Sequence, residues 1–124
     1  MKRVVLAGTL GLIAALLFGL PAPAQDNTTR AASFAKDVLP VLKTSCGKCH
    51  TGANAKAKID LSSYEAVKKG GKSGPVLVEG DPDKSSLVSS ISGDKPDMPK
   101  NAKPLTKAQV MAISAWIKEG AKNN

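Results

Sequence analysis

The two cysteines and the one histidine of this 124-residue chain all lie within five consecutive residues. They form the sequence Cys46-Gly47-Lys48-Cys49-His50, in which two thiols lie three residues apart and an imidazole follows directly. In a helical turn this spacing brings both sulfur atoms to about the same side of the backbone. Any chemistry based on cysteine or histidine must therefore take place at this one segment.

The rest of the chain supplies little material for a hydrophobic core. Only 3% of its residues are aromatic, and the formal net charge is +8. One small domain with so few large apolar side chains usually needs a disulfide, a metal or a cofactor for stability. Two cysteines limit the choice to one disulfide or one ligated group.

Residues 1–24 are typical of a secretory signal peptide. Lys2 and Arg3 precede a nearly apolar run over residues 4–20, and an Ala-x-Ala pattern ends at residue 24. Because the apolar run is almost long enough to span a bilayer, an uncleaved N-terminal anchor is the alternative. We expect an exported, periplasmic bacterial protein that is soluble after cleavage and bound to the membrane only if this segment is retained.

The chain after the signal predicts short helices separated by long loops. Residues 25–32 are expected to be a flexible tail, and residues 33–122 to form one domain. Helical spacing of apolar residues and capping signals occur in four places: after Ser33, over 60–70 with Ser62-x-x-Glu65, from Asp81-Pro82 to Ile91, and after Thr106-x-x-Gln109 up to Gly120. Pro40 should kink the first helix or mark a fresh start. Apart from residues 76–78 no segment indicates a strand, so the predicted class is all-α.

The pattern C-x-x-C-H is the covalent attachment site of a c-type haem. Cys46 and Cys49 would form thioethers with two vinyl groups on one porphyrin edge, and His50 would face the iron. A structural zinc site needs four ligands, which two cysteines and one histidine do not supply. A thioredoxin-like pair would follow a strand, and a plain disulfide would leave His50 without a role. We therefore predict one covalently attached haem c with its iron.

A second axial ligand to the iron must come from another residue type, and methionine sulfur is the soft donor available. Met111 falls on the polar face of the last predicted helix and should face water. Met98 lies in a loop bracketed by Pro96 and Pro99, which hold the loop extended. Met98 is therefore the expected ligand. The alternative is a five-coordinate iron, which would indicate a peroxidase-like enzyme or a gas sensor.

The chain resembles class I cytochromes c, and most closely planctomycete-type cytochrome c domains. The resemblance covers about residues 33–121 and includes the cysteine motif, the stretch 74–82, Met98-Pro99 and residues 105–117. It implies a small helical fold around one covalent haem, with Cys46 and Cys49 as anchors, His50 as proximal ligand and Met98 as distal ligand. It also implies an electron carrier rather than an enzyme. Lys100 stands where that family often has a second proline.

Ligation by histidine and methionine closes both axial positions and favours one-electron exchange. His50 should donate the N–H of its other ring nitrogen to a carbonyl, with the Gly74-Pro75 loop as a candidate, and Trp116 is expected near the haem edge.

A haem-free protein that binds another metal or cycles a disulfide is a further alternative.

Several lysines lie close to the motif in the sequence: Lys48, Lys56, Lys58, Lys68, Lys69 and Lys72. A basic rim of this kind would steer an acidic redox partner protein. Their spacing lacks the interleaved aromatic residues of nucleic-acid binding surfaces, so no nucleic-acid partner is predicted.

Overall fold

The computed structural model describes residues 30–124, so the predicted signal peptide and most of the predicted tail lie outside the described residues. Over 30–124 the chain consists of helices and loops, with two isolated β-bridges and no strand. The predicted all-α class is confirmed, and residues 76–78 belong to an extended connection. No helix within this range is long and apolar enough to cross a bilayer.

The first helical segment runs unbroken through η2 (Phe34–Val38), α1 (Leu39–Val41) and η3 (Leu42–Cys46). The Ser33 hydroxyl caps its start, as predicted. Pro40 does not end the helix. Because proline has no N–H to donate, the backbone bonds on either side widen to the π-helical pattern, in which each N–H donates to the carbonyl five residues earlier.

A short turn, η4 (Lys56–Lys58), precedes the second helix, α2 (Tyr64–Lys69). The cap of α2 is Ser63, whose hydroxyl accepts a hydrogen bond from a first-turn N–H, and the helix stops at Gly70. The predicted stop is confirmed, but the predicted start with a Ser62 capping box is wrong. Ser62 instead donates its N–H to Asp60 in the preceding loop.

The third helix, α3 (Ser86–Ile91), also begins later than predicted, at the cap residue Ser85. Asp81 caps only the turn before it, where its carboxylate accepts the N–H of Lys84 at 3.1 Å. The predicted apolar face is confirmed, because the side chains buried on α3 are Leu87, Val88 and Ile91.

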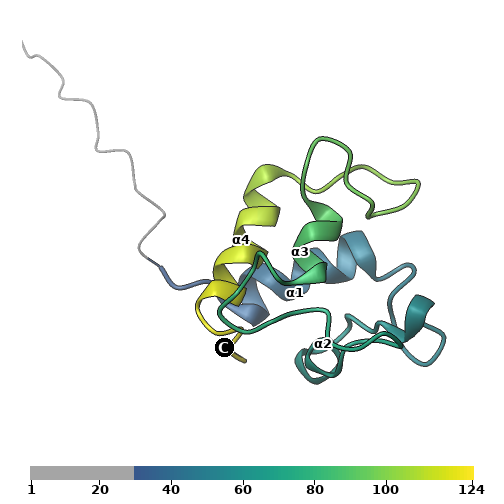
Figure 1. Ribbon diagram of the computed structural model, residues 1–124, viewed down its shortest axis with the longest axis horizontal. Helices are drawn as coiled ribbons and strands as arrows, with labels where there is room; N and C mark the ends of the chain where they lie inside the picture. The colour runs from purple at the N-terminus through teal and green to yellow at the C-terminus, as the bar shows by residue number, and fades with distance from the viewer. Residues whose placement is uncertain (1–29) are drawn as a thin grey trace, which may run out of the picture.

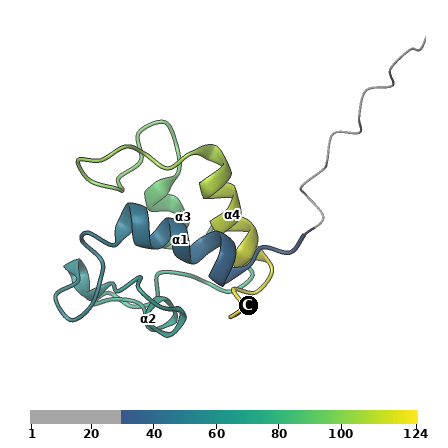
Figure 2. The ribbon, with the colours of Figure 1, turned by 180° about the vertical axis from the view of Figure 1, so that it is seen from behind.

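The fourth helix, α4 (Lys107–Lys118), has the predicted capping box between Thr106 and Gln109. Its buried stripe consists of Ile113, Trp116 and Ile117, with Val110 half-buried. In Figures 1 and 2 this helix crosses the beginning of the first helical segment and lies beside α3.

Three aromatic side chains fill the core where α4 meets the first segment. The ring of Phe34 lies 5.4 Å from that of Tyr64 and 5.2 Å from that of Trp116. The chain end closes over this cluster, because the backbone carbonyl of Asn124 accepts hydrogen bonds from Ser33 and from the N–H of Ala35. The buried core extends along the first helical segment from this aromatic cluster to Leu42, and Cys46 at the end of η3 is partly buried against it.

Candidate functional site

The cysteine motif forms a tight turn at the end of η3. The N–H groups of Cys49 and His50 both donate to the carbonyl of Cys46, at 3.1 and 3.0 Å. Gly47 fits this turn because a Cβ there would lie 2.4 Å from the carbonyl oxygen of Lys43. The helix therefore delivers both thiols and the imidazole in one compact turn, as the spacing predicts.

Cys46, His50 and Met98 line one cavity, although Met98 lies far from the other two in the sequence. The remaining lining residues come from the loops after the motif and from α3, and they are Ile59, Leu61, Val76, Ser86, Leu87, Ser90 and Ile91. Cys49 is half-buried in the adjoining turn and is not part of this lining. The fold thus gathers three of the four predicted site residues on one cavity and holds the fourth beside it.

The imidazole of His50 is oriented by the backbone. Its Nδ1 atom lies 3.0 Å from the carbonyl oxygen of Ile59. Because a carbonyl can only accept, Nδ1 is the donor in this bond. In the neutral imidazole Nε2 then keeps a lone pair, which is the arrangement that a metal-binding histidine needs. The prediction that the Gly74-Pro75 loop supplies the accepting carbonyl is wrong, because Ile59 supplies it. A second hydrogen bond holds the segment around Ile59 against the cysteine motif, because the N–H of Leu61 donates to the carbonyl of His50 at 2.9 Å.

Met98 is held at the cavity by its own backbone. Its N–H donates to the carbonyl of Ser90 in α3 at 2.9 Å, and its side chain is partly buried against the core. Met111 is 64% exposed on α4, which confirms that it faces water. Of the methionines within 30–124, Met98 is therefore the one whose thioether the fold brings to His50.

The cavity wall is apolar with few polar groups. Leu61, Val76, Leu87 and Ile91 are buried, and the two serines in the wall have hydrogen-bond partners within the chain. A wall of this kind suits the apolar face of a cofactor that carries a few polar groups. Ile59 and Leu61 were not among the residues predicted for the site. The signal that could have found them is their alternation with Asp60, which is typical of a segment with one apolar side.

Burial raises the pKa of the Cys46 thiol, because desolvation disfavours its thiolate form. Both cysteines are free thiols in the structure. Over the described residues no group of three or more histidine, cysteine, aspartate or glutamate side chains is arranged to hold a metal ion. The cavity lining offers one thiol, one imidazole nitrogen and one thioether, and Cys49 adds a second thiol in the adjoining turn. These donors fit a covalently attached haem c.

Trp116 does not line this cavity, contrary to the expectation that it packs near the haem edge. It is 1% exposed, contacts Phe34 and Tyr64, and donates its indole N–H to the carbonyl of Lys122 at 2.7 Å. Its role is to fill the core at the far end of the first helical segment.

Comparison with known proteins supports the resemblance inferred from the sequence. The family model described as Planctomycete cytochrome C matches residues 46–101, a span that begins at the first cysteine and includes Met98. Neither the curated proteins nor the solved structures contain a match.

Proposed function

We propose that this chain, whose residues 46–101 match the family model described as Planctomycete cytochrome C, is an exported monohaem c-type cytochrome that carries single electrons between redox partners. The observation that carries the proposal is the convergence of Cys46, His50 and Met98 on one apolar cavity, with the imidazole already held by Ile59. This arrangement matches the donor set of a six-coordinate haem c.

Each residue has a distinct task in this proposal. The thiols of Cys46 and Cys49 would form the two thioethers by adding to the haem vinyl groups, and Nε2 of His50 and Sδ of Met98 would bind the iron. A haem held by these ligands supplies an iron that changes its charge by one electron. The carbonyl of Ile59 fixes the imidazole tautomer and increases its basicity as a ligand.

The apolar wall has two effects on electron transfer. Leu61, Leu87 and Ile91 keep water away from the site and lower its local dielectric. A thioether ligand and a dry surrounding both favour the reduced, less charged state and so raise the reduction potential. With His50 and Met98 both bound to the iron, no open position would remain for oxygen, and electron exchange would be favoured.

Charge on the surface suggests the kind of partner. Lys48, Lys56, Lys58, Lys69 and Lys72 take part in no ion pair among residues 30–124, whereas Lys68 pairs with Glu79. Unpaired lysines close to the site raise the local concentration of an acidic protein and speed its association. The proposed partners are therefore redox proteins with an acidic docking surface.

Mass spectrometry of the denatured protein tests the proposal, after expression with its N-terminal segment in a host that attaches haem c. Thioethers survive denaturation and thiol reduction, so the expected mass is that of the chain plus one haem. The Cys46→Ser/Cys49→Ser variant should lose the added mass. Lys48→Gln lies between the two cysteines and is the matched control, which should keep it. A wild-type mass without haem would contradict the proposal and favour another metal site or a disulfide.

A further inference from the structure

Helix α3 contributes both apolar and polar side chains to the cavity that contains His50. The apolar ones are Leu87 and Ile91, which are buried, and the polar ones are Ser86 and Ser90. Each pair is spaced by four residues, so the two hydroxyls form one ridge of the helix and the two apolar side chains form the ridge beside it. Of the residues that line the cavity, Ser86 is the exposed one. Ser86 therefore lies where the cavity opens to solvent.

The hydroxyl of Ser86 makes a hydrogen bond that the fold does not need. It donates to the carbonyl oxygen of Val76 at 3.3 Å, which is long for a bond between a hydroxyl and an oxygen. The same carbonyl also accepts the N–H of Leu87 at 2.8 Å. Because Val76 keeps this second partner, the Ser86 hydroxyl can turn to another acceptor without leaving a buried carbonyl unpaired.

Ser90, one helical turn further along, is bound more firmly. Its hydroxyl donates to the carbonyl of Ser86 at 2.7 Å, within the usual range for such a bond. Its own carbonyl accepts the N–H of Met98. Ser90 therefore helps to hold Met98, and Ser86 is the hydroxyl of the cavity wall that remains available as a donor.

A haem in this cavity would bring two propionate carboxylates, which lie on the porphyrin edge opposite the vinyl groups. Ionised carboxylates are costly to remove from water unless they accept hydrogen bonds. Among the described residues that line the cavity, none is a lysine or an arginine. The carboxylates must therefore be served by water, by the backbone or by a hydroxyl of the wall.

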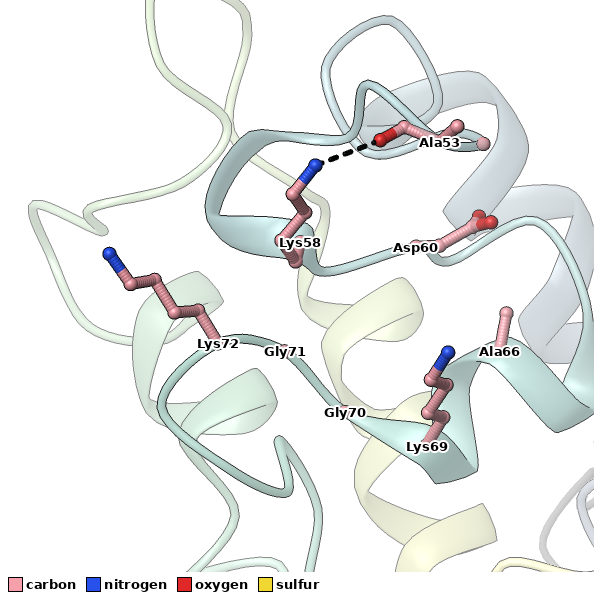
Figure 3. A pocket seen from close by; sticks show the side chains of 9 residues that line it. Ala53, Lys58, Asp60, Ala66, Lys69, Gly70, Gly71 and Lys72 are labelled. Carbon is pink, nitrogen blue, oxygen red and sulfur yellow. Dashed lines mark hydrogen bonds between the residues drawn. The ribbon is translucent and has the colours of Figure 1, made fainter.

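The lysines of this region do not converge on the cavity. Lys58, Lys69 and Lys72 line a separate cleft, and Figure 3 shows their side chains pointing in different directions. Ile59 belongs to the wall of the cavity, whereas both of its neighbours in the sequence belong to that cleft. The backbone at Ile59 therefore separates these ammonium groups from the cavity.

We propose that the hydroxyl of Ser86 donates a hydrogen bond to one haem propionate, so that Ser86 orients the haem with its carboxylate edge at the cavity mouth. This inference rests on the proposed function. A hydroxyl bonded to a carboxylate is held more strongly than one bonded to a neutral carbonyl, which favours the exchange of Val76 for the propionate. The adjacent ridge of Leu87 and Ile91 suits the apolar part of the porphyrin.

A hydrogen bond of this kind also affects the reduction potential. Negative charge close to the iron stabilises the oxidised state, which is the more positive one. A donor to the propionate draws part of that charge away from the haem and so raises the potential. Ser86 is thus a positioning residue whose loss should lower the potential of the holoprotein.

Resonance Raman spectra of the holoprotein test the proposal through the bending mode of the propionates, whose frequency rises with the strength of their hydrogen bonds. Ser86→Ala should shift this mode to lower frequency, whereas Ser86→Thr keeps the hydroxyl and should keep the wild-type frequency. The control Ser89→Ala removes an exposed hydroxyl of the same helix that does not line the cavity, and should leave the mode unchanged. An unchanged mode in Ser86→Ala, or an equal shift in the control, would overturn the proposal.

The reduction potentials of the same samples provide a second readout. The potential of Ser86→Ala should fall below those of wild type, Ser86→Thr and Ser89→Ala. A propionate mode that shifts in Lys58→Gln/Lys69→Gln/Lys72→Gln but not in Ser86→Ala would place the carboxylates at the lysine cleft and overturn the proposal.

Failure of this inference is distinguishable from failure of the proposed function. None of these substitutions changes a cysteine or a proposed axial ligand, so each variant should carry haem and keep the low-spin spectrum of wild type. A wild-type protein without haem would contradict the proposed function and this inference with it. A haem-loaded protein whose propionate mode does not depend on Ser86 would overturn this inference alone.

Discussion

The Nδ1 atom of His50 and the carbonyl oxygen of Ile59 are 3.0 Å apart and form the hydrogen bond that orients the imidazole. Ile59 in turn lies between the cavity lined by His50 and Met98 and the backbone of Gly71. The orientation of the histidine therefore depends on how closely the two loops on either side of Ile59 approach each other.

Substitution of Gly71 tests this dependence. In Gly71→Ala the new Cβ would lie 2.4 Å from Cγ1 of Ile59 and 2.8 Å from the carbonyl oxygen of Ala57, so Ile59 must move. We expect the free energy of unfolding to fall by about 1–3 kcal/mol, as in other overpacked sites. We also expect the NMR resonance of the His50 ring N–H to shift. Gly80→Ala adds the same methyl group in open space and should leave that resonance unchanged. Equal shifts in both variants would argue against the contact.

Ser85 is a buried hydroxyl that the sequence pattern did not single out. It is 1% exposed, accepts the N–H of Val78 at 2.9 Å and donates to the carbonyl of Asp81 at 2.8 Å. Ser85→Ala leaves both backbone groups without a partner, so urea unfolding should show a loss of about 1–3 kcal/mol. Ser89→Ala removes an exposed hydroxyl from the same helix and should change stability by less than about 0.5 kcal/mol. A loss of stability in Ser85→Ala no greater than in this control would contradict the role of the Ser85 hydroxyl as the partner of both backbone groups.

The carboxylate of Asp60 predicts a dependence of stability on acid. Hydrogen bonds from Ser62 and Gly52 lower its pKa in the folded protein relative to the unfolded chain. The contribution of the Asp60 carboxylate to the free energy of unfolding is therefore complete above its pKa in the unfolded chain. This contribution is lost as the pH falls through the lower pKa of the folded protein. Asp60→Asn should show a smaller loss of stability over that acidic range than wild type. Asp94→Asn, in an exposed loop, is the control, and identical acid profiles for Asp60→Asn and wild type would disprove the contribution.

The features that could be predicted from the sequence are those with local signals. The capping box of Thr106 and Gln109 and the buried stripe of α4 depend on residues within a few turns of one another. The stop of α2 at Gly70 is equally local. Helix periodicity predicts that Met111 is exposed on α4. Met98 lies in a loop without a helical pattern, and its side chain is half-buried.

The features that could not be predicted depend on tertiary contacts. Ser62 and Ser63 are adjacent candidates for the same cap, and the bond between Ser62 and Asp60 decides in favour of Ser63. Similarly, Asp81 is a good cap by sequence, but contacts with Val78 place Ser85 at the start of α3. The partner of His50 is a backbone carbonyl, for which no side-chain pattern exists.

The positive surface predicts how salt affects the rate of electron transfer. After the predicted cleavage, which removes Lys2 and Arg3, the formal charge falls from +8 to +6. An anionic reagent such as hexacyanoferrate should therefore oxidise the reduced protein more slowly as ionic strength rises. A cationic reagent such as hexaammineruthenium should show the opposite trend. Stopped-flow rates over a series of salt concentrations provide the measurement. Rates that do not depend on salt for either reagent would remove the argument for an acidic partner.

The central claim is that Met98 completes the coordination of a haem held by His50. The optical spectrum of the oxidised holoprotein tests this claim most directly, when wild type is compared with Met98→Ala and with the control Met111→Ala. Wild type and Met111→Ala should both be low-spin with a sulfur-to-iron band, because Met111 is exposed on α4. Met98→Ala should lose that band and readily bind cyanide when oxidised, or carbon monoxide after reduction, since one axial position becomes open. A Met98→Ala spectrum that keeps the low-spin form and the sulfur-to-iron band would contradict the account.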